Sequence, residues 1–147
     1  MRTKTMVVMV FFALGLMFGV CPSVYAIQGH ESTGSSKVTV PATVAEILTA
    51  VDLQIADLEK TITANALDKV HVTAFSIRDL LLALPEKASA LSPIGKVTLT
   101  SSLSKIKQQA GLLDKYGDAG DLAQTKAVFV KFKDEIEKIK QIPGIKP

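Results

Sequence analysis

Apolar residues recur at alternating intervals of four and three positions in four stretches of this 147-residue chain. Such intervals return side chains to one face of an α-helix, whereas a half-buried strand would alternate strictly between apolar and polar residues. The first stripe comprises Val44, Leu48, Val51, Ile55, Leu58 and Ile62. The other three comprise Leu67, Val70, Ala74, Ile77, Leu81 and Leu84; Leu99, Leu103, Ile106, Ala110 and Leu113; and Leu122, Thr125, Phe129, Phe132, Ile136 and Ile139.

Residues typical of helix ends bracket each stripe and predict helices over about 43–64, 66–84, 93–116 and 119–141. Side chains that can accept hydrogen bonds from the free amides of a helix start stand before each stripe. They are Thr43 paired with Glu46, then Asn65, Ser92, and either Asp118 or Asp121. Pro85 and Gly117 are predicted to end the second and third helices, because proline lacks an amide donor and glycine tolerates the left-handed conformation.

The four stripes are similar in length and are joined by short connections. No stripe can be shielded from water alone, so the helices must pack against one another, with consecutive helices antiparallel. The sequence therefore predicts an all-α, antiparallel up-down four-helix bundle over residues 43–142, followed by a short tail at 143–147.

The N-terminus has the composition of a secretory signal peptide. Arg2 and Lys4 precede an apolar run over 6–20, which is shorter than the roughly 20 residues of a membrane-spanning helix. Val24 and Ala26 supply the small residues of a cleavage site, so we expect cleavage after Ala26 and a periplasmic or secreted protein. The alternatives are a lipoprotein processed at Cys21 and an uncleaved anchor. Residues 27–42, mostly small and polar, are expected to form a flexible leader.

Removal of residues 1–26 changes the chemistry open to the chain. The full sequence has 17 basic and 14 acidic side chains, and the removed segment takes two basic ones, leaving a net charge of +1. Nothing in that balance suggests a nucleic-acid partner, and no stable membrane span is expected in the mature chain. All cysteine and methionine is removed as well, which excludes disulfides, thiolate nucleophiles, soft copper(I) sites and iron-sulfur clusters.

His71 is the only histidine inside the predicted bundle, on the flank of the second stripe. Arg78 lies on the same flank, Asp79 follows it, and Asp68 lies three residues before His71. One interpretation is a partly buried histidine with a hydrogen-bond partner. The other is a divalent metal site built on His71 and carboxylates such as Asp68, with Arg78 as an alternative holder of an anionic group.

The sequence offers little to an enzyme. Serines 101, 102 and 104 have no candidate base other than His71, and no glycine-rich phosphate loop follows a strand. Glu135 is predicted to lie on the solvated face of the last helix, paired with Lys131. We therefore expect no catalytic activity and no cofactor other than a divalent metal.

The strings Val70 to Leu80, with the pattern His-x-x-Ala-Phe-x-Ile-Arg-Asp-Leu, and Gly117 to Asp121, with the pattern Gly-Asp-Ala-Gly-Asp, resemble a group of small bacterial secreted helical proteins. The resemblance covers residues 37–140. It implies an association with heavy-metal efflux loci. Members of that group often carry additional histidines near the start of the second helix, whereas here Val70 and Val72 flank a lone His71.

Two functional hypotheses follow. The first is an exported accessory or binding protein linked to metal stress in the periplasm, with a divalent metal or a protein as its partner. The alternative is a purely structural protein–protein interaction module without a ligand.

Overall fold

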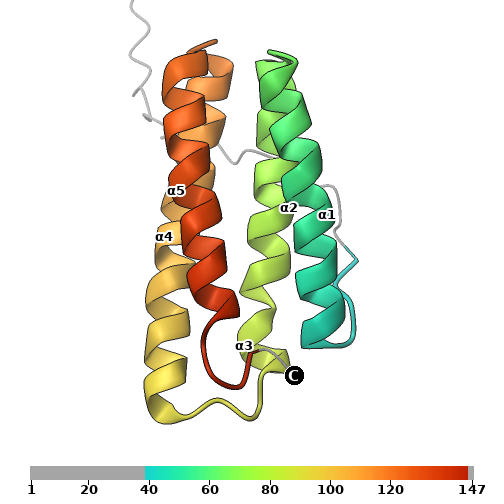
Figure 1. Ribbon diagram of the computed structural model, residues 1–147, viewed down its shortest axis with the longest axis vertical. Coiled ribbons are helices and arrows are strands. Elements are labelled where there is room, and N and C mark those ends of the chain that lie inside the picture. The colour runs from blue at the N-terminus through green and yellow to red at the C-terminus, as the bar shows by residue number, and fades with distance from the viewer. Residues whose placement is uncertain (1–38, 146–147) are drawn as a thin grey trace, which may run out of the picture. The chain divides into compact units, whose positions relative to one another are not determined.

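The structure is a computed structural model that describes residues 39–145, and all regular structure in that range is helical. The prediction of an all-α fold is confirmed for these residues. Four long helices are α1 (Val44–Thr63), α2 (Val70–Leu82), α4 (Pro93–Asp118) and α5 (Leu122–Lys140), as Figure 1 shows. A 3₁₀ turn, η1 (Leu67–Lys69), precedes α2, and the short α3 (Leu84–Lys87) follows it. The predicted signal peptide and all of the leader before residue 39 lie outside the described residues.

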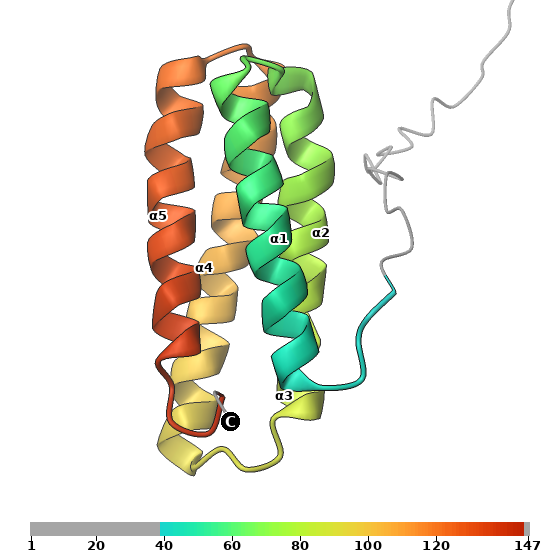
Figure 2. The same ribbon diagram turned by 45° about the vertical axis from the view of Figure 1, so that its right-hand side comes forward.

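The four long helices lie side by side, and the chain reverses direction from each one to the next (Figure 2). Helix α4 packs against α2 and α5, while α1 packs against α2 and, less closely, α5. Ion pairs link α1 to α5, from Lys133 Nζ to Glu59 Oε1 at 2.9 Å and from Lys140 to Asp52. Within the described range, no helix has both the length and the apolar character needed to cross a membrane.

The predicted stripes form the core. Every stripe residue is buried except Val44, Ile55 and Leu122, which are half-buried at its margin. The core also contains apolar residues outside the stripes, among them Ile47, Leu80, Val128, Ile142 and Ile145. The extra helical positions are buried because each helix packs against two neighbours, which requires a wider apolar face than a single stripe.

Three predicted helix starts are present. Thr43 and Glu46 form a reciprocal capping box, in which Thr43 Oγ1 accepts from the Glu46 amide at 3.2 Å and Glu46 Oε2 accepts from the Thr43 amide at 3.1 Å. Ser92 Oγ accepts from the Gly95 amide at 3.1 Å, and Asp121 Oδ1 accepts from the Gln124 amide at 3.0 Å. Each contact satisfies an amide that has no partner within its own helix.

Asn65 was expected to cap the start of the second helix, but it does not. It follows the end of α1 in the left-handed conformation, with φ of 57°. Its amide donates to the Ile62 carbonyl at 3.1 Å, and the Ala66 amide donates to the Thr61 carbonyl at 3.0 Å. This pair of bonds is a Schellman motif, and asparagine is one of the few residues besides glycine that tolerate the required backbone angle.

The end of α4 corrects two further predictions. Helix α4 continues through Gly117 to Asp118, so Asp118 is its last residue and not the cap of α5. Gly120 has the left-handed φ of 68°, and its amide donates to the Gly117 carbonyl at 2.9 Å. The Asp121 amide donates to the Tyr116 carbonyl at 2.9 Å, which completes a second Schellman motif. The glycine that ends the helix is therefore Gly120.

Gly117 has a different role. A Cβ atom at this buried position would lie 2.9 Å from the Leu67 carbonyl oxygen and 3.4 Å from the Val70 Cβ. Only glycine lets the last turn of α4 approach the start of α2 this closely. That approach positions the candidate site described below.

Two other boundaries differ from prediction. Helix α2 ends at Leu82, and Pro85 lies in the first turn of α3, where proline is tolerated because the first helical amides need no partner within the helix. Within the predicted tail, Ile145 is buried. Gly144, with φ of 92°, turns the chain there, and a Cβ atom on it would lie 3.3 Å from the Ala90 carbonyl oxygen.

Candidate functional site

His71, Asp114 and Asp118 form a cluster between the start of α2 and the end of α4. One ligand atom from each residue, a ring nitrogen and two carboxylate oxygens, lies within 4.8 Å of the other two. His71 and Asp114 are half-buried, and Asp118 is exposed. The three side chains therefore converge on a point that is open to solvent on one side.

The fold explains this convergence. Because α2 and α4 run in opposite directions, the first turn of α2 faces the last turns of α4. Asp114 and Asp118 are four residues apart, and this spacing places both carboxylates on one face of α4. The close approach at Gly117 brings that face to the start of α2, which begins one residue before His71.

His71 has an unsatisfied polar atom. Its Nδ1 is buried and has no hydrogen-bond partner among the described residues. Buried polar side-chain atoms are usually paired, so this unpartnered ring nitrogen calls for an explanation. A metal ion or an ordered water molecule would supply the missing partner.

The two carboxylates favour a cation, while the start of α2 opposite them carries a partial positive charge that opposes one. The C-terminal end of a helix carries a partial negative charge, and here the two carboxylates add to it. A bound cation would reduce the repulsion between the carboxylates of Asp114 and Asp118.

The donor set also suits a divalent ion. One imidazole nitrogen and two carboxylate oxygens are ligands of Zn²⁺ and its neighbours in the first transition row. Ligand atoms around a tetrahedral Zn²⁺ lie about 3.4 Å apart, given metal–ligand distances of about 2.1 Å. The 4.8 Å limit on the cluster is therefore compatible with closure by small side-chain rotations.

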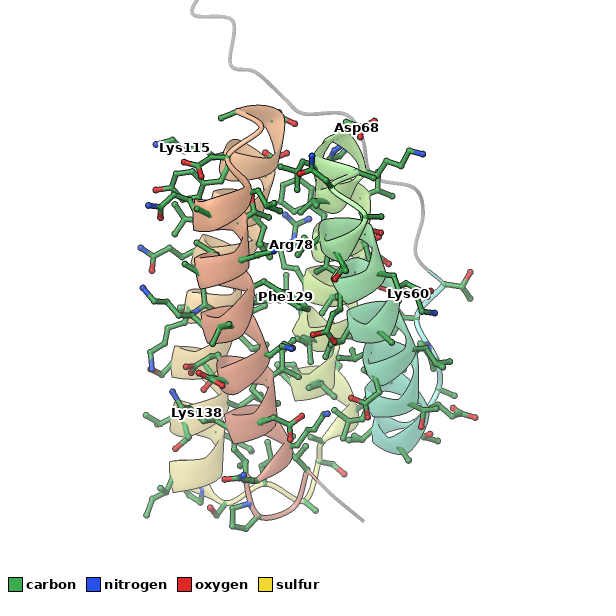
Figure 3. All side chains as sticks on the ribbon, turned by 45° about the horizontal axis from the view of Figure 1, so that its top comes forward. Lys60, Asp68, Arg78, Lys115, Phe129 and Lys138 are labelled. Atoms are coloured by element: carbon green, nitrogen blue, oxygen red, sulfur yellow. The ribbon has the colours of Figure 1, made fainter. Side chains whose placement is uncertain are left out.

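The other residues predicted for a site do not join His71. Asp68 is exposed in η1 and is not part of the cluster. The Nε and Nη2 atoms of Arg78 both lie 2.8 Å from Asp79 Oδ1, and its guanidinium lies 4.4 Å from the centre of the Phe75 ring. Figure 3 shows Asp68 at one end of the helices and Arg78 farther along them. Arg78 is thus paired with the neighbouring residue of its own helix.

Sequence reasoning missed the partners of His71, although a signal for them existed. Antiparallel packing of the second and third predicted helices implies that the start of one faces the end of the other. Asp114 and Asp118 are the carboxylates spaced four residues apart at that end. The interpretation of Asp118 as a helix cap obscured this pairing.

A second polar cluster surrounds Glu135, which sequence reasoning had placed on the solvated face with Lys131. The Glu135 side chain is only 3% exposed; its Oε1 lies 3.3 Å from Lys105 Nζ, and its Oε2 lies 3.0 Å from Lys138 Nζ. Burial raises the pKa of this carboxyl, but hydrogen bonds from Ser102, Lys138 and Lys105 outweigh burial and leave the pKa below its ordinary value. Lys105 and Ser102 come from α4, so the cluster ties α4 to α5.

The lowered pKa of Glu135 predicts a dependence of stability on acid. Because the folded-state pKa lies below the ordinary value of 4.5, the stabilisation is fully present above pH 4.5 and is lost as pH falls through the folded-state pKa. We expect Glu135→Gln to lower the melting temperature at pH 7 and to flatten its decline in acid. Thermal melts between pH 7 and pH 2 measure both effects. The exposed Glu86→Gln is the matched control, and an unchanged acid decline in Glu135→Gln would contradict the assignment.

No protein-family model matches the chain, and neither the curated proteins nor the solved structures contain a significant match to it.

Proposed function

We propose that this protein is an exported up-down four-helix bundle that binds a divalent cation through His71, Asp114 and Asp118, as an accessory protein in metal stress. The observation that carries the proposal is the cluster itself, in which three ligand atoms from two helices lie within 4.8 Å of one another. The unpartnered Nδ1 of His71 supports it. Export and the association with metal stress rest on the signal-peptide pattern and on the sequence resemblance.

The donor set selects the class of ion. Two carboxylates and one imidazole suit Zn²⁺, Co²⁺, Ni²⁺ or Mn²⁺, whereas soft copper(I) prefers sulfur ligands. Three protein ligands leave coordination positions for water or for a donor from another molecule. Such an open site fits a protein that takes up or hands on an ion better than one that only needs the ion for folding.

Isothermal titration calorimetry of the purified protein with each of these four ions tests the proposal. We expect one ion per chain, and we expect His71→Ala and Asp114→Asn each to weaken binding by roughly a hundredfold or more, since loss of an outer-shell group alone costs about 10- to 100-fold. Asp68→Asn is the matched control, because Asp68 is an exposed aspartate near the site but outside the cluster. It should bind like the unmodified protein.

The proposal is wrong if His71→Ala binds as tightly as the unmodified protein, or if Asp68→Asn weakens binding as much as Asp114→Asn does. Absence of any measurable heat with all four ions would also reject it. The interaction module without a ligand would then be the better account of the bundle.

A further inference from the structure

A groove of about 740 Å³ lies between the first half of α4 and the last turns of α5. The groove opens at the start of α4, whereas the cluster of His71, Asp114 and Asp118 lies at the end of the same helix. The two are therefore far apart. Figure 3 shows Lys138, which lines the groove, at the opposite end of the bundle from Asp68 and Lys115. Its volume is within the roughly 300–1,000 Å³ of typical small-molecule sites.

One part of the groove is cationic. Glu135 lies there with both carboxylate oxygens already bound, one to Lys105 and one to Lys138. The two lysine side chains are 53% and 61% exposed, and each ammonium group has three donors, of which Glu135 uses one. The three side chains together carry a charge of +1. Hydrogen-bond donors therefore remain available, while both oxygens of the carboxylate are occupied.

The other part of the groove is apolar. Ile94 and Val97, three residues apart on α4, line it and are 80% and 71% exposed. Ile142 and Pro143, after the end of α5, complete this side. These apolar surfaces and the two ammonium groups border the same groove, so one molecule could contact both.

We propose that this groove binds a small amphipathic anion, an alkyl carboxylate of medium chain length. Its head group accepts hydrogen bonds from Lys105 and Lys138, and its chain covers Ile94 and Val97. The net positive charge of the lysine–glutamate cluster selects an anion over a cation. The exposed apolar pair adds affinity only for a head group that carries a hydrocarbon chain.

Titration of the whole protein with decanoate, followed by calorimetry below the micelle concentration, tests the proposal without any variant. Decan-1-ol has the same chain without the charge, and butyrate has the same head group on a short chain. We expect one decanoate per protein and at least about tenfold weaker binding of both controls, since each forfeits one of the two contacts. Equal affinity for decanoate and decan-1-ol would reject the role of the lysines, and equal affinity for decanoate and butyrate would reject that of the apolar wall.

Variants locate the site. Lys105→Ala and Lys138→Ala should each weaken decanoate binding by about threefold or more, as expected for partly exposed charges. Val97→Ser should weaken it similarly because it removes apolar contact area. Lys107→Ala and Val130→Ser, exposed side chains on the same two helices that do not line the groove, should leave affinity unchanged.

Glu135→Gln gives a result of opposite sign. It raises the charge of the cluster from +1 to +2 and should tighten decanoate binding, measured at a temperature where circular dichroism shows the variant folded. Weaker binding in this variant would overturn the proposal that the net positive charge of the cluster selects the ligand. Sedimentation without ligand adds a separate check, because a dimer that Val97→Ser dissociates would identify the groove as a self-association surface and overturn the proposal.

Discussion

Replacing Phe132 by alanine is expected to lower the free energy of unfolding by about 3–5 kcal/mol. Phe132 is fully buried in α5 and is the bulkiest of the completely inaccessible side chains in the core. Its truncation removes apolar contacts and leaves a cavity that the surrounding helices can fill only in part. Such a loss is a large fraction of the roughly 5–15 kcal/mol that stabilises a typical domain.

Urea denaturation followed by circular dichroism measures this effect, with Phe75→Ala as the matched control. Phe75 is only half-buried on α2, with the Arg78 guanidinium stacked on it, so its truncation should cost clearly less. Equal losses in the two variants would show that Phe132 is not at the centre of the core.

Gly117→Ala is expected to lower the free energy of unfolding by about 1–3 kcal/mol, as overpacking of a tight contact does. The added methyl group would lie 2.9 Å from a backbone oxygen, that of Leu67, which cannot rotate away as a side chain could. Helix α4 must then move away from η1 and the start of α2. Because His71 and Asp114 lie on either side of this contact, the variant should also bind the proposed metal ion more weakly.

Gly111→Ala is the matched control for Gly117→Ala and should have the opposite effect. Gly111 is exposed within α4, and a Cβ atom there would meet nothing within 4 Å. Alanine is favoured over glycine inside a helix by roughly 0.5–1 kcal/mol, so Gly111→Ala should stabilise the protein. Urea denaturation of both variants gives the comparison, and a stable Gly117→Ala protein would contradict the close approach.

Much of the fold could be predicted from the sequence because local signals agree with the global packing. The four stripes have a helical period, and the side chains of Thr43, Ser92 and Asp121 satisfy amides within three residues of themselves. Such interactions are decided by neighbours in the chain. They can therefore be identified before the tertiary structure is known.

The sequence-based predictions differ from the structure mainly where a residue's conformation or burial depends on contacts with a distant part of the chain. Gly117 and Gly120 are both plausible helix terminators by sequence; in the structure Gly117 stays helical beside Leu67, and Gly120 takes the left-handed conformation. Glu135 borders the apolar stripe of α5, and its burial there depends on Lys105 and Ser102 of α4 as well as on Lys138 of its own helix. Asn65 is ambiguous by sequence, because asparagine suits both helix starts and left-handed helix ends.

The candidate metal site depends both on a local signal in the sequence and on a contact between distant parts of the chain. His71 was identified because it is a rare residue on the flank of a stripe, but its partners belong to a helix that is remote in sequence. The pattern around His71 itself pointed to Asp68, which is nearby in the chain and lies outside the cluster. The carboxylates that the fold brings to His71 belong to α4, which is distant in sequence and adjacent in space.

Because His71 and Asp114 are far apart along the chain, an ion bound to both would also affect stability. All of α3 and most of α2 and α4 lie between these two residues. An ion bound to both would close that long loop and act as a reversible cross-link, which restricts the unfolded chain much as a disulfide does. In a protein whose predicted mature chain contains no cysteine, metal availability would then set how firmly its two halves are held together.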